Sequence, residues 1–180
     1  MYSYDIKIPK ERVAVLIGVK GEIKKRIQKE TDTSIAVDSK EGLVTVSGED
    51  AIQLMVAREI VKAIARGFNP EIAMTLLKPD NAFELIDLKL VTTTRNDLER
   101  IKGRIIGMKG KSRKTMEDLT ECYVSVYGKT VAVIGEITMV QICKRAVSML
   151  IQGSPHSHVF SWLEGQRRKF KQEMFEGKQL

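Results

Sequence analysis

The sequence contains two copies of one pattern, and this duplication limits the possible folds more than any other feature. The letters VLIGVKG at Val15–Gly21 reappear as RIIGMKG at Arg104–Gly110, a shift of 89 residues from position 18 to position 107. In each copy a helix-like segment, two strand-like segments and a long segment of helical periodicity follow in the same order. Five matching features in one order argue against chance, and they predict a repeat of one supersecondary unit.

Each copy is expected to contain a strand, two short helices, two strands and a long helix. The strands are predicted from alternating apolar residues and the helices from apolar residues three and four positions apart. In the first copy these elements are expected over residues 5–9, 10–17, 22–30, 34–37, 44–48 and 50–66. In the second copy they are expected over residues 85–90, 96–106, 111–120, 123–126, 131–135 and 137–152.

The duplication predicts two small domains of α+β class, joined by a linker and followed by a tail. The domains are expected over residues 1–67 and 82–153. Residues 68–81 contain two prolines and form the expected linker, whose apolar side chains are predicted to pack on a domain. Pro155 is expected to end the preceding helix, and residues 154–180 are expected to form a basic helical tail.

The charge of the chain is positive and uneven. Lys and Arg number 30 and Asp and Glu number 23, so the net charge is +7. Residues 1–80 contribute +1 of this charge and residues 81–180 contribute +6. A basic surface favours an anionic partner, and nucleic acid is the first candidate. The second domain is therefore expected to be the stronger binder.

Composition excludes several other classes of protein. With 43% hydrophobic residues the chain is too apolar for a disordered protein. Its apolar runs are too short for a transmembrane helix, and the N-terminal residues do not resemble a signal peptide. Cys122 and Cys143 have no metal-site spacing and are interpreted as buried apolar residues. We expect a cytoplasmic protein with no membrane partner, no metal and no cofactor.

Each copy carries a glycine loop that opens a short helix. The loops are Gly18-Val19-Lys20-Gly21 and Gly107-Met108-Lys109-Gly110. A helix N-terminus presents unpaired N–H groups and the positive end of the helix dipole, and both attract phosphate. Glycine has no side chain, so a nucleic-acid backbone can approach closely. The lysine in each loop adds a cation beside the expected phosphate.

Basic residues extend the positive face beyond both loops. The candidate phosphate-binding residues outside the loops are Lys24, Lys25, Arg104, Lys111, Arg113 and Lys114. Residues 95–114 hold eight basic and two acidic side chains. The alternative is that the glycines only permit a tight turn between helices. Two such loops inside matching repeats favour the phosphate-binding interpretation.

Each copy resembles a type I KH domain, an RNA-binding module of β-α-α-β-β-α order. The resemblance is carried by Gly18, Gly21, Ile23, Lys24, Ile105, Ile106, Gly107 and Gly110. Ile23 stands one position earlier than the usual motif has it. The resemblance covers residues 4–153 and implies two modules in which three helices cover a three-stranded sheet. It also implies that each loop clamps the backbone of about four nucleotides of single-stranded RNA.

The same resemblance implies an aliphatic groove for the bases in each module. Its candidate walls are Ile17, Ile35, Val37, Ile106, Val124 and Val126. The aromatic content of 6% fits an aliphatic groove better than a platform of stacking rings. Each of these six residues is also a candidate for the hydrophobic core, and for any single one the core is the favoured interpretation.

The order of two KH modules, the segment 150–155 and a basic tail is similar to a family of small-subunit ribosome-assembly factors. These factors partner the endonuclease that trims the 3′ end of small-subunit rRNA. In their eukaryotic members the first module has lost its glycine loop, whereas here both loops are present, which indicates the archaeal version. The resemblance implies binding of pre-rRNA near its 3′ end and docking of the endonuclease.

Other functions are weaker interpretations. Gly110-Lys111-Ser112 matches the end of a P-loop, but Ile105 stands where the first glycine belongs and a helix is expected where a strand is needed. His156 and His158 are expected to be exposed loop residues rather than a metal pair. We therefore predict a protein that is not an enzyme. A regulatory or general binder of mRNA or single-stranded DNA, and a protein-docking scaffold, remain as alternatives.

Overall fold

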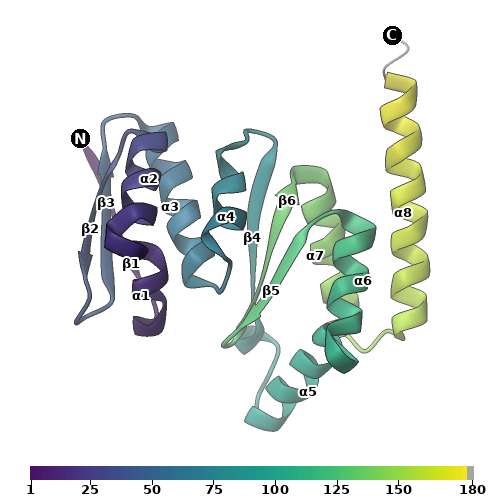
Figure 1. The fold of residues 1–180 in the computed structure, drawn as a ribbon. Coiled ribbons are helices and arrows are strands. Elements are labelled where there is room, and N and C mark those ends of the chain that lie inside the picture. The colour runs from purple at the N-terminus through teal and green to yellow at the C-terminus, as the bar shows by residue number, and fades with distance from the viewer. Residues whose placement is uncertain (178–180) are drawn as a thin grey trace. The chain divides into compact units, whose positions relative to one another are not determined.

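The structure is a computed structural model that describes residues 1–177. The chain forms two compact units, Met1–Phe83 and the part from Glu84 onward, which are described one at a time (Figure 1). Each unit contains a three-stranded sheet and helices, so the predicted α+β class and the predicted order of elements are confirmed. None of the helices within residues 1–177 combines the length and apolar character that a membrane span requires.

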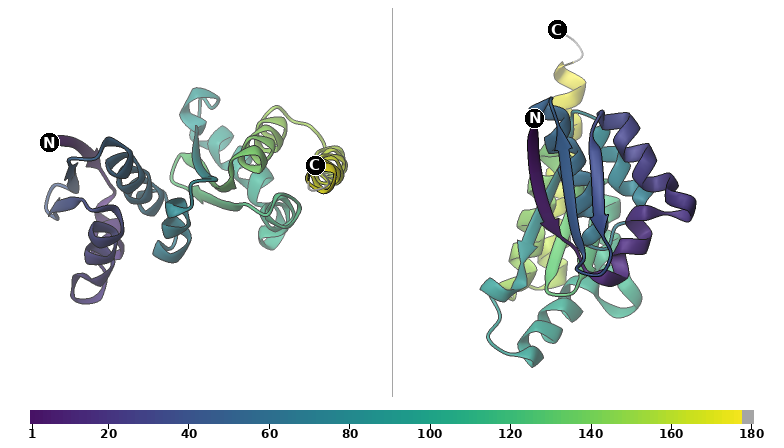
Figure 2. Two further views of the ribbon diagram at one scale, coloured as in Figure 1. Left: turned by 90° about the horizontal axis from the view of Figure 1, so that it is seen from above. Right: turned by 90° about the vertical axis from the view of Figure 1, so that its left-hand side faces the viewer.

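The first unit places its three main helices on one face of the sheet. The strands β1 (Tyr2–Lys7), β2 (Ser34–Asp38) and β3 (Leu43–Gly48) are antiparallel and have the order β1-β3-β2. Figure 2 (right) looks onto this sheet, with the helices behind it. The helices are α1 (Lys10–Ile17), α2 (Glu22–Thr31) and α3 (Ala51–Ala65). Val44 and Val46 of the central strand are fully buried beneath these helices and form part of the hydrophobic core.

The second unit repeats this plan and adds a helix. Its strands are β4 (Asn81–Asp87), β5 (Tyr123–Tyr127) and β6 (Thr130–Glu136), in the order β4-β6-β5. Its helices are α5 (Arg95–Ile106), α6 (Lys111–Thr120), α7 (Ile137–Ile151) and α8 (His156–Gly177). Helix α8 packs on α6 and α7, and its Val159 and Leu163 are buried in the core of the unit. The basic tail is therefore part of this unit as far as the structure describes it; residues 178–180 of the expected tail lie outside the described residues.

The linker residues fold onto the first unit. Helix α4 (Pro70–Ala73) and a 3-10 turn at Met74–Leu77 pack against α3. Asn69 caps α4 by accepting a hydrogen bond from the Glu71 amide. Glu71 in turn pairs with Arg26 of α2 at 2.7 Å. The apolar side chains of this segment explain the packing, because Met74 and Leu76 are each only 6% exposed.

The first strand of the second copy differs from the prediction. Alternation predicted a strand over residues 85–90, but β4 ends at Asp87. The Asp87 carboxylate accepts a hydrogen bond from the Lys89 amide at 2.9 Å, which bends the chain into a 3-10 turn at Leu88–Leu90. Leu88 is buried and Leu90 is 84% exposed, so the apolar alternation continued past the end of the strand.

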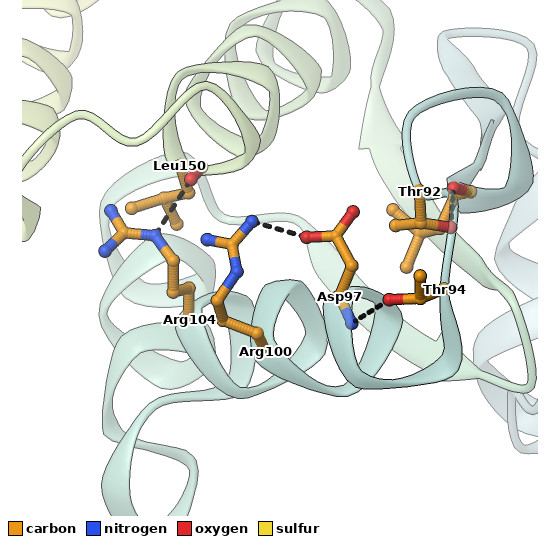
Figure 3. A network of polar contacts seen from close by, with 7 residues as sticks. Thr92, Thr94, Asp97, Arg100, Arg104 and Leu150 are labelled. Carbon is orange, nitrogen blue, oxygen red and sulfur yellow. Dashed lines mark hydrogen bonds and ion pairs between the residues drawn. The ribbon is translucent and has the colours of Figure 1, made fainter.

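In each unit an arginine of the first helix donates hydrogen bonds to carbonyl groups at the end of the long helix and just after it. In the first unit the Arg12 guanidinium of α1 donates to the carbonyl oxygens of Ile64 (2.7 Å) and Phe68 (2.6 Å). In the second unit Arg104 of α5 donates to Leu150 (3.0 Å) and Ser154 (2.7 Å), and Figure 3 shows the first of these bonds. Carbonyl groups at a helix C-terminus lack partners within the helix, so a charged donor stabilises them.

We expect Arg104→Ala to lower the free energy of unfolding by about 2 kcal/mol, because it leaves two partly buried carbonyl groups without a charged donor. Urea unfolding followed by circular dichroism measures the change. Arg100→Ala is the matched control on the same helix. Arg100 is exposed and pairs only with Asp97 in Figure 3, so its loss is expected to cost less than about 0.5 kcal/mol. Equal losses for the two variants would contradict a structural role for Arg104.

Candidate nucleic-acid interface

The two glycine loops have the same backbone geometry. Gly18 and Gly107, at the C-terminal ends of α1 and α5, have φ/ψ of 73°/177° and 72°/174°. Lys20 and Lys109 both take the left-handed conformation, with φ of 52° and 53°. The two loops differ only in having Val19 or Met108 at the second position, and both adopt the same backbone conformation.

The first glycine of each loop is required by close packing as well as by conformation. A Cβ on Gly18 would lie 2.5 Å from Cγ1 of Ile23, and one on Gly107 would lie 2.7 Å from the backbone nitrogen of Ser112. Either distance is far inside van der Waals contact. A positive φ with ψ near 180° is also a region that essentially only glycine occupies. The first glycine therefore lets the loop fold tightly against the first turn of the following helix.

The second glycine of each loop faces open space. A Cβ on Gly21 would meet only the far end of the Lys25 side chain at 3.9 Å, and one on Gly110 would have nothing within 4 Å. Their φ values of 78° and 77° still favour glycine. The packing thus leaves the backbone accessible on the outer side of both loops, where a ligand's backbone can approach.

The helices that follow the loops begin without a side-chain cap. Gly21 and Gly110 are the N-cap residues of α2 and α6, and neither helix receives a hydrogen bond from a capping side chain. By contrast, Asp50 caps α3 and Thr94 caps α5. The first residue of each helix donates its N–H to a carbonyl oxygen of the loop. The N–H groups that follow it in the first turn receive no side-chain cap, and the helix dipole favours an anion beside them. Both loops therefore present an anion-binding helix terminus.

The predicted cations surround the loops and most of them have no ion pair. Lys20 and Lys109 are exposed at the loops, and beside them Val19 and Met108 are 72% and 83% exposed. The candidate lysines that make no ion pair among residues 1–177 are Lys20, Lys24, Lys25, Lys109, Lys111 and Lys114. Arg113 has a weak contact of 3.8 Å with Glu117, and both ends are partly exposed. These charges remain available to an anionic ligand.

Arg104 differs from the other candidate cations. Its guanidinium donates to the Leu150 carbonyl in α7 and to the Ser154 carbonyl in the segment that follows, as described above. The side chain is also only partly exposed. Its position next to the loop matches the prediction, but its hydrogen bonds give it a structural task that the sequence did not reveal.

The six candidate groove residues separate into two groups. Ile35 and Val124 are core residues, with exposures of 2% and 3%. The other four are partly exposed beside the helices and the edge strand: Ile17, Val37, Ile106 and Val126. Two of the six candidates therefore belong to the core, and four are exposed enough to line a groove. Four aliphatic side chains remain accessible to a ligand.

In each unit a hydrogen bond that the sequence analysis missed joins the second helix to the edge strand. The Gln28 side chain of α2 accepts from the Ile35 amide at 2.9 Å, and the Glu117 side chain of α6 accepts from the Val124 amide at 2.8 Å. β2 and β5 are edge strands, so these amides have no strand partner. Gln28 and Glu117 are 89 residues apart, and so are Ile35 and Val124. This repeat spacing is the signal that could have identified both pairs.

The cysteines and histidines do not form a reactive site. Cys122 and Cys143 are both buried, as predicted. The hydrogen bond with Cys122, together with burial, raises the pKa of Cys143 well above its usual value, so this thiol stays protonated at neutral pH. Within residues 1–177 no three His, Cys, Asp or Glu side chains gather in a metal-binding cluster.

The prediction of exposed loop histidines is confirmed only for the exposure of His158 and is otherwise wrong. His156 and His158 lie in the first turn of α8 rather than in a loop, because the preceding proline starts the helix. His156 is half-buried, and its Nε2 lies 2.8 Å from the carbonyl oxygen of Arg104. It therefore helps to hold the tail helix beside α5.

Comparison with known families matches each unit separately. The model for the eukaryotic-type KH domain (KH-domain type I) matches residues 82–168. The model for the KH domain matches residues 3–63. Both units therefore match the module that their glycine loops predict.

Individual relatives cover most of the chain. A KH domain-containing protein of Methanocaldococcus jannaschii is 47% identical over 175 residues, which are 95% of this chain and 77% of the relative. The pre-rRNA-processing protein PNO1 of Candida albicans is 31% identical over 127 residues, 68% of this chain, but this chain spans only 45% of its length. A chain of the a/eIF2alpha–aDim2p–rRNA complex from Pyrococcus horikoshii is 44% identical, with a TM-score of 0.86 and coverage of 93% of this chain and 95% of that one.

We expect Gly107→Ala to lower the free energy of unfolding by about 3 kcal/mol, because the new Cβ clashes with Ser112 and the backbone conformation is strained. Gly110→Ala is the matched control. It adds only the cost of a left-handed alanine, about 1 kcal/mol, because the space around it is open. Urea unfolding of both variants measures the difference, and a larger loss for Gly110→Ala would be inconsistent with these two roles.

Proposed function

Because this chain belongs to the Dim2/Pno1 family of tandem KH-domain proteins, we propose that it binds single-stranded RNA at its two glycine loops. The observation that carries the proposal is the uncapped start of α2 and α6 behind an open glycine. Neutral side chains would have capped these helices at little cost, as they do elsewhere in the chain. A helix start left open beside several unpaired lysines suits a phosphate ligand.

In this mechanism the loop holds the backbone of the RNA. A phosphate approaches Gly21 or Gly110, where no side chain blocks it. The N–H groups that follow the first residue of α2 or α6 donate to its oxygens, and Lys20 or Lys109 neutralises its charge. The neighbouring lysines bind further phosphates and make the affinity depend on salt.

The bases lie on the aliphatic residues beside the loop. Ile17 and Val37 in the first unit, and Ile106 and Val126 in the second, are partly exposed and provide apolar contact without a ring. The hydrogen bonds of Gln28 and Glu117 hold the edge strand against the helix, so the distance between the two walls is set before RNA binds. This is a binding role, and we propose that the protein is not an enzyme.

The proposed RNA is small-subunit pre-rRNA near its 3′ end. Two relatives support rRNA as the class of ligand: a pre-rRNA-processing protein in Candida albicans, and a Dim2 protein whose structure from Pyrococcus horikoshii contains rRNA. The 3′ end, and docking of the endonuclease that trims it, follow from the family resemblance. They belong to this chain as proposals, together with a cytoplasmic location.

We expect Met108→Asp/Lys109→Asp to weaken binding of single-stranded rRNA at least about tenfold, because two carboxylates then face the phosphates. Val19→Asp/Lys20→Asp is expected to weaken it less, about threefold, because the first unit has less excess charge. Fluorescence anisotropy measures both affinities, and circular dichroism checks that the variants are folded.

The matched control is Ser3→Asp/Lys7→Asp. It makes the same change in charge on exposed residues of β1, which belongs to neither loop. If this control weakens binding as much as the Met108/Lys109 variant, the effect is one of total charge and the loop proposal fails. A larger loss from the first loop than from the second would overturn the ranking of the two units.

A map of RNA cross-links in cells is expected to concentrate near the 3′ end of small-subunit rRNA. This result separates the proposal from the alternatives by the identity of the bound RNA. Cross-links spread over many mRNAs would instead support a regulatory binder. An absence of RNA cross-links would support a protein-docking scaffold and would reject the proposed function.

A further inference from the structure

The second unit contains an insertion of nine residues that the first unit lacks. The Ile8 amide donates to the Gly42 carbonyl at 2.8 Å, and the Leu88 amide donates to the Lys129 carbonyl at 2.9 Å, so Ile8 and Leu88 are equivalent. From there the chain needs 10 residues to reach the first glycine of its loop in the first unit, and 19 in the second. The additional residues make the Leu88–Leu90 turn, the segment 91–94 and a longer α5.

This insertion builds a pocket of about 440 Å³, which we call the insertion pocket. Its walls come from the inserted segment, the first turns of α5 and the turn between β5 and β6. The lining residues are Lys89, Thr92, Thr93, Thr94, Arg95, Leu98, Glu99, Gly128 and Lys129. In the first unit the corresponding turn has no room for a side chain at Gly42, because a Cβ there would be 2.6 Å from the Ile8 carbonyl oxygen.

The charge of the insertion pocket is positive and unsatisfied. Lys89, Arg95 and Lys129 are exposed, and none of them makes an ion pair within residues 1–177. The single acidic lining residue, Glu99, already has a cationic partner, because its carboxylate lies 3.5 Å from Lys102. Three cations beside one compensated carboxylate favour an anionic ligand.

The hydroxyl groups of the insertion pocket are ordered by the surrounding chain. Thr92 donates to the Leu88 carbonyl at 2.7 Å, and the Thr94 hydroxyl accepts from the Asp97 amide at 3.1 Å (Figure 3). Because Thr94 already caps α5, the start of this helix contributes little to anion binding. The three side-chain cations and the shape of the pocket carry the inference.

The insertion pocket lies at the far end of the proposed RNA groove. Helix α5 forms one side of that groove and ends at the second glycine loop, and its 12 residues span about 18 Å. Strand β5 forms the other side and ends at Tyr127, next to the pocket residues Gly128 and Lys129. A strand of RNA held at the loop and directed along the groove would therefore reach the pocket.

We propose that the insertion pocket binds a phosphate of the same RNA strand, beyond the nucleotides held at the second glycine loop. This proposal rests on the proposed function and extends it. It gives the second unit a longer footprint on RNA than the first. It also assigns a task to Lys89, Arg95 and Lys129, which contribute to the excess charge of the second half of the chain.

The test uses random-sequence RNA pools of four and ten nucleotides with the full chain. We expect Lys89→Ala/Arg95→Ala/Lys129→Ala to weaken binding of the ten-nucleotide pool about tenfold and of the four-nucleotide pool less than about twofold. The slope of log affinity against log salt for the longer pool is expected to fall by about 0.7, the value for one phosphate contact on a single strand. Fluorescence anisotropy measures these quantities, and circular dichroism verifies folding.

The matched control is Lys7→Ala/Lys29→Ala/Lys78→Ala, which removes the same charge from exposed residues of the first unit. An equal loss in the control, or an equal loss for both RNA lengths, overturns the insertion pocket as a distinct phosphate site. Inorganic phosphate is titrated separately by NMR. Shifts at Thr92–Arg95 with free phosphate, but no dependence on RNA length, would show a site for free anions and overturn the proposal. Failure of the unaltered protein to bind either pool would instead reject the proposed function.

Discussion

The close approach of each first loop glycine to the following helix is the contact on which the candidate sites depend. Gly18 meets Ile23 and Gly107 meets Ser112 at distances that no larger residue permits. This contact sets the turn between two short helices, and the turn directs the start of α2 or α6 outward without a cap. Helix amides without a side-chain cap, a second glycine with open space beside it and an exposed lysine then follow from one local constraint.

Around this shared constraint the two units have diverged. Both keep the helix-to-strand hydrogen bond of Gln28 or Glu117, and both secure the end of the long helix with an arginine. The units differ in charge, because residues 81–180 have a net charge of +6 and residues 1–80 a net charge of +1. They also differ in length, because the second unit has the nine-residue insertion and the added helix α8. The shared hydrogen bonds maintain the same arrangement of helices and strands, while the differences change the charge and the segments around the loop.

The arginines show how residues of one type divide between stability and binding. Arg104 precedes the second glycine loop and Arg113 follows it, and both were predicted from the sequence to bind phosphate. Arg104 donates to two carbonyl groups, whereas Arg113 is about half exposed and has only a weak contact with Glu117. A guanidinium that already satisfies carbonyl groups loses those bonds if it turns to a ligand. Proximity to a motif therefore does not assign a role to a cation.

The sequence alone determined the duplication, the order of elements, the α+β class and the conformation-restricted glycines, because these depend on short-range periodicity and on residue types with few allowed conformations. It did not determine where β4 ends, the helical position of His156, or which of Ile35 and Val37 is buried, since each depends on partners distant in the chain. The insertion pocket is lined by residues from 89–99 and 128–129, and no local sequence pattern predicts that these two segments lie together. Only tertiary packing decided it, because burial and the pairing of charges are properties of the assembled surface.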